Sequence, residues 1–207
     1  MKNNHKKQLN LLSTIFLGIL VFSSCETKSS RTTDGLIIYQ EQFLSWVRNF
    51  EPLNPASVPR WPTRGGIYEP LYIYNPIKAD WIPWLATSYR WENNNKKLIF
   101  TIREGVKWSD GISFSANDVA YTFNLTKEYA ALDTRNSWEY LESVKALSNT
   151  TLEVNFNRVY VPGFDAVAGT FIIPKHIWEH LDDPLKFNNP KPVGTGPFTE
   201  VLRFDSQ

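Results

Sequence analysis

The placement of proline constrains the fold of this chain more than any other feature of its sequence. Seven of the 13 prolines lie in residues 52–83 and six lie in residues 162–197, whereas residues 84–161 contain none. Proline cannot donate a backbone hydrogen bond to a β-ladder and cannot continue a helix. The proline-free middle is therefore expected to hold most of the regular secondary structure, between two loop-rich flanks.

Two β-hairpins are predicted in this middle part. Residues 88–92 and 97–103 carry β-forming side chains at alternate positions, and the intervening asparagines 93–95 tolerate a left-handed backbone. Residues 144–147 and 152–156 form a similar pair. One face of each hairpin is expected to be apolar. The residues assigned to these faces are Leu98, Phe100 and Ile102 in the first hairpin and Leu152, Val154 and Phe156 in the second.

One helix is predicted between the two hairpins. Residues 115–118 resemble a capping box, and the helix is expected to run from about Ala116 to Tyr129. Its apolar face is assigned to Ala116, Val119, Ala120 and Phe123. Strands that alternate with a helix indicate an α+β or mixed α/β fold rather than a helical bundle or a simple sandwich.

The N-terminus has the features of an export signal. Lys2, Lys6 and Lys7 precede an uncharged, mostly apolar run of 12 residues that ends just before Ser23-Ser24-Cys25. Twelve residues are too few for a transmembrane helix, which needs about 20. Small residues before a lone cysteine resemble the lipobox of bacterial lipoproteins. We therefore expect a signal peptide over residues 1–24, lipidation of Cys25 and a flexible tether over residues 25–33.

Charge and cysteine content exclude several classes of site. The formal net charge is +1, so a basic nucleic-acid-binding surface is not expected. A single cysteine cannot form an internal disulfide or supply a multi-thiolate metal centre. No cofactor or metal is predicted.

Five short motifs, in order along the chain, identify a resemblance to a known family. They are Tyr-Glu-Pro-Leu at 68–71, Pro-Trp-Leu-Ala at 83–86, the segment 103–119 with its Trp-Ser-Asp-Gly turn, Ile-Pro-Lys-His-Ile-Trp at 173–178 and Val-Gly-Thr-Gly-Pro-Phe at 193–198. Together they resemble the family 5 extracellular solute-binding proteins, which are the peptide, nickel and oligosaccharide receptors of ABC importers.

The resemblance implies a fold and a function. The implied fold is an α/β fold of the periplasmic-binding-protein type II kind, with a mixed sheet, flanking helices and β-hairpins. Residues 34–207 would be the N-terminal lobe of a two-lobed clamp whose C-terminal lobe is missing. The implied function is that of an exported, lipid-anchored, monomeric receptor, not an enzyme, that delivers a small oligomeric solute to an ABC permease.

The ligand is expected to be an oligopeptide or an oligosaccharide. Residues 82–86, preceded by Trp81, resemble the cello-oligosaccharide branch of the family. Aromatic faces pack against sugar rings and apolar side chains, and ligand contacts concentrate in loops. The ligand contacts predicted on this basis are Trp46, Trp61, Tyr68, Glu69 and Trp138.

Two other functions are compatible with parts of the sequence. His176, Glu179 and His180 have the His-x-x-Glu-His spacing of inverted zinc metallopeptidases, but the prolines around them allow only a short helix. A surface lipoprotein that binds glycans without transporting them is the second alternative. Residues 194–197 start like a dinucleotide-binding loop but are predicted to form a tight turn. The family resemblance implies that this turn lies near the ligand cleft and precedes a strand over residues 198–204.

Overall fold

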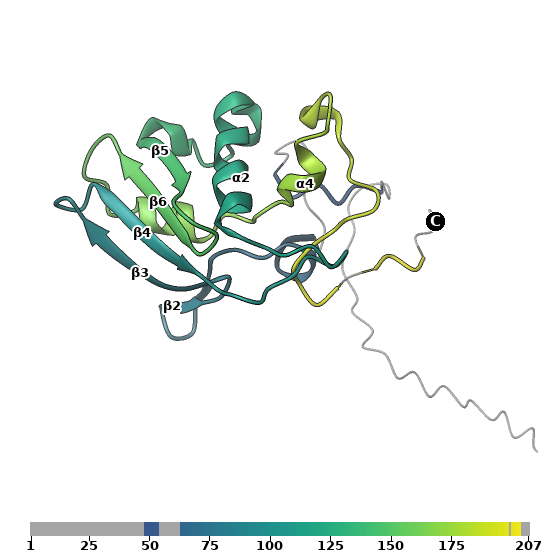
Figure 1. Cartoon of the computed structure of the whole chain (residues 1–207), viewed down its shortest axis with the longest axis horizontal. Helices are drawn as coiled ribbons and strands as arrows, with labels where there is room; N and C mark the ends of the chain where they lie inside the picture. Colours follow the sequence, from purple (N-terminus) through teal and green to yellow (C-terminus); the bar gives the residue numbers. More distant parts are fainter. Residues whose placement is uncertain (1–47, 54–62, 199, 204–207) are drawn as a thin grey trace, which may run out of the picture. The chain divides into compact units, whose positions relative to one another are not determined.

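The computed structural model describes residues 48–53, 63–198 and 200–203 (Figure 1). The chain divides into two units, Met1–Glu41 and Gln42–Gln207, and every described residue belongs to the second. The predicted signal peptide, Cys25, the tether, Trp46 and Trp61 all lie outside the described residues. Among the residues that are described, no helix has the length and apolarity needed to cross a membrane.

A four-stranded antiparallel sheet forms the centre of the described part (Figure 1). Its strands are β3 (Ala86–Glu92), β4 (Lys97–Ile102), β5 (Leu141–Ala146) and β6 (Thr151–Phe156), and their spatial order is β3-β4-β6-β5. Both predicted hairpins are therefore confirmed, and the second begins three residues earlier than expected. Asn93, Asn94 and Asn95 all have positive φ, between 50° and 60°, in the first turn.

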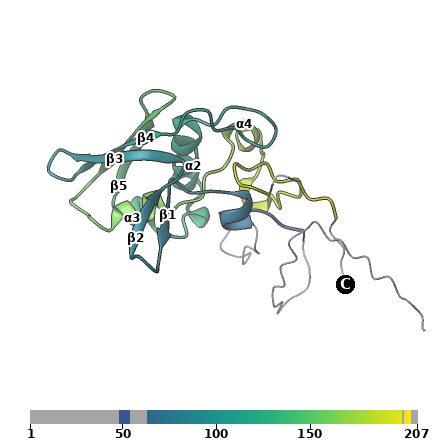
Figure 2. The same cartoon turned by 90° about the horizontal axis from the view of Figure 1, so that it is seen from below.

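A two-stranded antiparallel hairpin, β1 (Tyr72–Asn75) and β2 (Asp80–Pro83), lies outside this sheet. Figure 2 shows it below β3, with α3 (Gly163–Ala168) beside it. Every pairing between named strands is antiparallel, so the expectation of a mixed sheet was wrong in this detail. Short turns link β1 to β2, β3 to β4 and β5 to β6. Because each turn reverses the direction of the chain, the two strands that it joins are antiparallel.

The helix α2 (Ala116–Glu128) confirms the predicted capping box. The Ser115 side chain accepts a hydrogen bond from the backbone of Asn117, and the Asp118 carboxylate accepts one from the Ser115 backbone N–H at 2.8 Å. The four residues assigned to the apolar face of this helix are all buried. This face packs against β5 and β6 (Figure 1).

The main core lies between the sheet, α2 and α3. All six residues assigned to the apolar faces of the hairpins are buried in it. Ile99, which points to the opposite face of β4, is also buried. Phe164 of α3 packs against Tyr72, Tyr89 and Phe100, with ring centroids 4.4–6.1 Å apart. This aromatic cluster fixes the β1–β2 hairpin against the sheet.

Short helical turns and loops make up the rest of the described part. Their bounds are Thr63–Ile67 (a kinked π-type turn), Ala130–Leu132, Ser137–Glu139 and Pro184–Lys186 (3-10 turns) and α4, Lys175–Trp178. Residues 195–197 bend as predicted. The strand expected over residues 198–204 is not formed at residues 198 and 200–203. The backbone N–H of Phe198 donates to the carbonyl oxygen of Gly66 at 3.1 Å, and one such bond is not a ladder.

Candidate functional site

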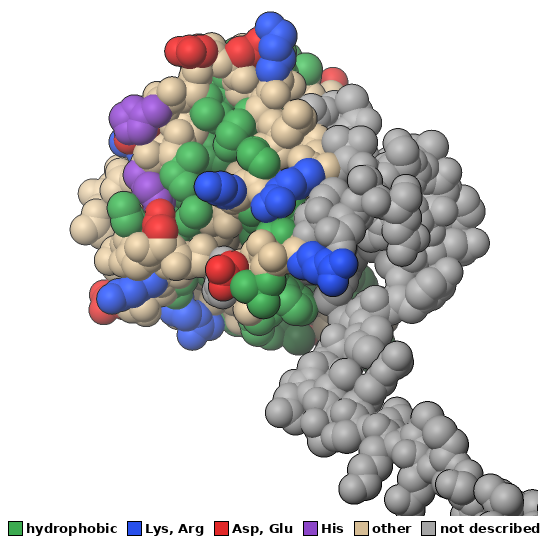
Figure 3. Space-filling model, turned by 90° about the vertical axis from the view of Figure 1, so that its right-hand side faces the viewer, with side chains coloured by type: hydrophobic (Ala, Val, Ile, Leu, Met, Phe, Trp, Pro, Cys, Tyr) green, Lys and Arg blue, Asp and Glu red, His purple; other side chains and the backbone are tan. Residues whose placement is uncertain are grey.

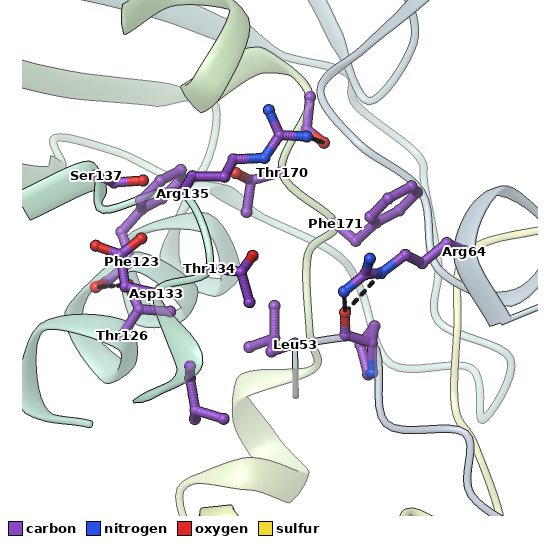
Figure 4. A pocket seen from close by; sticks show the side chains of 13 residues that line it. Leu53, Arg64, Phe123, Thr126, Asp133, Thr134, Arg135, Ser137, Thr170 and Phe171 are labelled. Carbon is purple, nitrogen blue, oxygen red and sulfur yellow. Dashed lines mark hydrogen bonds between the residues drawn. The ribbon is translucent and has the colours of Figure 1, made fainter. Parts of the chain in front are cut away.

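A small hollow of about 60 Å³ lies where four segments of the chain meet (Figure 4). It is lined by residues near the start of the described chain, from the Thr63–Ile67 turn, from α2 and the loop after it, and from the segment after α3. The lining residues are Pro52, Leu53, Arg64, Phe123, Thr126, Leu132, Asp133, Thr134, Arg135, Ser137, Gly169, Thr170 and Phe171.

Arg64 forms one side of this hollow. Its Nε and Nη2 atoms both donate to the carbonyl oxygen of Pro52, at 2.8 and 2.6 Å, and its guanidinium lies 5.9 Å from the centre of the Phe171 ring. Burial lowers the pKa of Arg64, the Glu51 carboxylate raises it in part, and the positive charge of Arg135 lowers it further. The side chain is thus held in place but lies near a like charge.

Arg135 approaches from the loop after α2. It is exposed, and its Nη2 atom lies 3.5 Å from the carbonyl oxygen of Gly169. Figure 4 shows the Phe171 ring between the two guanidinium groups and the Thr134 side chain nearby. An anionic group of a ligand placed here would relieve the repulsion between the two arginines.

Tyr68 and Glu69 do not line this hollow. The Tyr68 side chain has no exposed surface, and its hydroxyl accepts a hydrogen bond from Asn189. Burial raises the pKa of Tyr68 far above its usual value. The carboxylate of Glu69, which is 7% exposed, accepts a hydrogen bond from Trp84 Nε1 at 2.7 Å. Both residues therefore contact protein groups rather than solvent.

In the hydrogen-bonded pair of Glu69 and Trp84, Trp84 is the exposed residue. It was not selected from the sequence as a ligand contact. Trp84 is 40% exposed, although its indole nitrogen donates to Glu69 and its carbonyl oxygen accepts from Arg103 Nε at 2.6 Å. The one sequence signal was its place in the string 82–86, which resembles the cello-oligosaccharide branch.

Trp138 is brought next to the hollow. It follows Ser137, which lines the hollow, and its Nε1 atom donates to Phe123 and Thr126 of α2 at 3.0 and 3.1 Å. Lys127 Nζ lies 4.5 Å from the centre of its ring. The half-buried indole therefore fixes the loop that carries Arg135 against α2. None of the three described candidates is itself a lining residue of the hollow.

The histidines of the His-x-x-Glu-His motif have separate environments. His176 Nε2 lies 2.7 Å from the Asp110 carboxylate, whereas the His180 side chain is 76% exposed, beyond the end of α4. Figure 3 shows histidine side chains at one edge of a face whose middle carries both hydrophobic and basic side chains. Within residues 48–53, 63–198 and 200–203, no group of three His, Cys, Asp or Glu side chains could hold a metal ion.

Comparison with known families gives one match over most of the described chain. A family model described as bacterial extracellular solute-binding proteins, family 5 Middle, matches residues 80–201. The nickel-binding periplasmic protein of Escherichia coli K12 is 34% identical over 167 residues, which are 74% of this chain and 30% of that protein. Oligopeptide-binding protein AppA of Bacillus subtilis is 35% identical over 106 residues, covering 47% of this chain and 19% of its own length.

Solved structures give the same result. A periplasmic oligopeptide-binding protein of an ABC transporter from Thermotoga maritima superposes with a TM-score of 0.72 at 32% identity, over 79% of this chain and 31% of that one. Its mannohexaose-bound form gives a TM-score of 0.68 at 33% identity, over 75% of this chain and 29% of that one. The chain thus spans less than a third of the length of these relatives. The expected type II periplasmic-binding-protein fold class is confirmed.

Proposed function

Because this chain belongs to family 5 of the bacterial extracellular solute-binding proteins, we propose that it captures a small oligomeric solute for an ABC importer and delivers it to the permease. No bond is made or broken in this function. The observation that carries the proposal is the hollow between Arg64 and Arg135, on a domain with the fold of such receptors.

The small volume of the hollow favours a ligand site that is formed between two lobes. Ligand pockets have volumes of roughly 300–1,000 Å³, and this hollow holds about 60 Å³. It can therefore accept one group of a solute but not a whole oligomer. We propose that a second lobe closes over the solute, that contacts to both lobes stabilise the closed form, and that the permease binds that form.

The two arginines favour a solute with a carboxylate. Guanidinium groups bind carboxylates through paired, charge-assisted hydrogen bonds. A neutral sugar has no negative charge to pair with the arginines. Of the two ligand classes expected from the sequence, an oligopeptide with a free C-terminus fits this arrangement better. An oligosaccharide is the second candidate, favoured by the exposed, fixed Trp84 indole and by the mannohexaose bound to the Thermotoga maritima relative.

Export and anchoring complete the proposal. Residues 1–24 would be removed as a signal peptide, lipidated Cys25 would become the N-terminus, and residues 25–33 would tether the monomeric domain of residues 34–207 outside the cell membrane. The Escherichia coli relative is a periplasmic protein, which supports export. If the protein were an adhesive lipoprotein, no permease or ATPase genes would be expected beside its gene. If it serves an importer, a permease gene and an ATPase gene are expected there.

Titration with matched peptides tests the ligand site. Trialanine and trialanine amide differ in the terminal carboxylate, and their binding is followed by NMR chemical-shift changes of the full chain. We expect trialanine to bind at least tenfold more tightly than the amide, and Arg135→Gln to remove this difference. Arg90→Gln, an exposed arginine on β3, is the matched control and should leave the difference unchanged. Equal affinity for acid and amide would contradict the proposal for the arginines.

A further inference from the structure

A second and larger hollow, of about 260 Å³, lies between α2 and the segment that follows α4. It shares no lining residue with the hollow between the two arginines. We call it the α2–α4 hollow, and it is lined by Tyr121, Asn124, Leu125, Glu128, Tyr129, Trp178, Glu179, Leu181 and Pro184. Neither the family resemblance nor the proposed capture of a solute gives this hollow a role.

Aromatic side chains supply much of its lining. Tyr121 belongs to α2, Tyr129 is the C-cap residue that follows α2, and Trp178 is the last residue of α4. The Trp178 ring is almost fully buried and meets Phe187 edge to face, with ring centroids 5.2 Å apart. It belongs to the smaller core cluster beneath α2, together with Leu125. The aromatic lining is therefore fixed by the core behind it.

Two acidic residues, Glu128 and Glu179, line this hollow, and both are exposed. Burial raises the pKa of the Tyr121 hydroxyl to about 12, with further contributions from the negative charges of Glu179 and Glu128. The negative charge of both residues thus acts on the interior of the hollow. No lysine, arginine or histidine is among its lining residues.

The basic groups that contact Glu179 lie outside the lining. Lys175 Nζ is 3.7 Å from one oxygen of Glu179, and His180 Nε2 is 4.0 Å from the other. Both contacts are long and exposed, so they offset the charge of Glu179 only in part. For Glu128, no ion pair is formed within the described part of the chain.

We propose that the α2–α4 hollow binds an organic cation, an ammonium or guanidinium group on a short alkyl chain. Aromatic rings attract such cations through their faces, carboxylates supply the counter-charge, and the apolar lining accepts the alkyl part. The volume is slightly below the range for drug-sized ligands, which suits a group of this size. The cation comes either from a free amine or from an arginine side chain of a protein.

The test titrates the full chain with agmatine, a free guanidinium compound, and separately with the blocked tripeptide acetyl-Gly-Arg-Gly-amide. Binding is followed through the indole N–H signal of Trp178 in a nitrogen-15 NMR spectrum. We expect a saturable shift with agmatine and none with n-butanol, which has an alkyl chain and no charge. A shift with agmatine alone assigns the hollow to free amines, and a shift with both compounds admits protein side chains.

Charge-neutralising variants separate binding in the hollow from general attraction of the cation to carboxylates elsewhere on the surface. Glu128→Gln is expected to weaken agmatine binding at least fivefold, and the double variant with Glu179→Gln to abolish it. Glu142→Gln, an exposed glutamate on β5, is the matched control and should change the affinity less than twofold. The absence of a saturable shift, or equal weakening by Glu142→Gln, would overturn the proposal. The result is independent of whether trialanine binds elsewhere.

Discussion

At the scale of single residues, Gly194 and Gly196 determine how the C-terminal loop can pack. A Cβ atom at Gly194 would lie 2.0 Å from the carbonyl oxygen of Ile67, and one at Gly196 would lie 2.2 Å from that of Gly66. These are contacts with backbone, which cannot move aside as a flexible side chain can. The close approach allows Gly196 N–H to donate to Ile67 at 3.0 Å.

Gly194→Ala is therefore expected to destabilise the fold by about 2 kcal/mol or more, because the loop must separate from the Thr63–Ile67 turn. Gly111→Ala is the matched comparison. Gly111 has a φ of 91° and open space around its Cβ position, so alanine there costs only left-handed strain, about 1 kcal/mol. Urea unfolding of the two variants measures the difference. Equal losses would show that the close approach is not maintained in solution.

Asp110 links the turn after β4 to α4 through His176. Burial by itself raises the pKa of Asp110, but hydrogen bonds from His176 and the Ile112 N–H, together with the charge of His176, outweigh it and hold the pKa below its usual value. A carboxylate with a lowered pKa stabilises the fold above its unfolded pKa of 3.8, and this contribution is lost as the pH falls through the folded value.

Asp110→Asn is accordingly expected to lower stability at about pH 5.5, and the difference from the original protein is expected to shrink as the pH falls below 3.8 and through the lowered pKa of the folded state. Thermal unfolding midpoints of both proteins across this range provide the measurement. Asp118, whose pKa burial raises, titrates in both proteins and cancels in the comparison. A difference that stayed constant down to pH 2 would mean that the contact acts without charge.

Individual ligand contacts were harder to predict than the residues of the core. Tyr68 and Glu69 were selected because they stand in a proline-rich, loop-like stretch, yet both are buried. Their surroundings depend on partners distant in sequence, Asn189 for Tyr68 and Trp84 for Glu69. No local pattern encodes such pairings. Arg64 and Arg135 were missed for the same reason, since 71 residues separate them along the chain.

At the scale of elements, α2 shows how far local sequence determines structure. Its predicted start agrees with the structure, and its predicted end differs by one residue, because the Ser115–Asp118 capping box and the apolar spacing depend only on neighbours along the chain. The hairpin turn of three asparagines is local in the same sense.

Ser115→Ala should cost about 1 kcal/mol in the free energy of unfolding, because the backbone N–H of Asn117 loses its side-chain acceptor. Ser115→Asn keeps a capping acceptor and should stay within a few tenths of a kcal/mol of the original protein. Chemical denaturation followed by circular dichroism distinguishes the two. If Ser115→Asn were as costly as the alanine variant, the contribution of Ser115 would come from packing rather than from capping.

Elements that depend on distant partners were predicted less well. The first residues of β5 were missed because Leu141 and Ser143 are separated by an irregularity in the pairing with β6, which interrupts the alternation of apolar residues. The strand over residues 198–204, which was expected from the family resemblance, has no ladder partner among the described residues. An extended segment becomes a strand only where another strand accepts its hydrogen bonds.

At the scale of the whole molecule, two hollows on either side of α2 carry opposite electrostatic character. The one between Arg64 and Arg135 suits an anionic group, and the one between α2 and the segment after α4 suits a cation. Because they share no lining residue, changes of charge in one are expected to leave ligand affinity in the other within a factor of two. Solute capture and cation binding are therefore separable in variants of the same chain.

Membrane attachment is the property of the whole molecule that the sequence predicts most directly. One acyl chain holds a protein at a membrane only marginally, whereas two or three give stable attachment, so a diacylglyceryl group on Cys25 would retain the domain after cleavage. Cys25→Ser is expected to abolish incorporation of labelled palmitate and to move the protein from the membrane pellet to the soluble fraction. Ser24→Ala keeps a small residue before the cysteine and should remain in the pellet, labelled. Retention of Cys25→Ser in the pellet after a high-salt wash would instead indicate attachment by an uncleaved N-terminal segment.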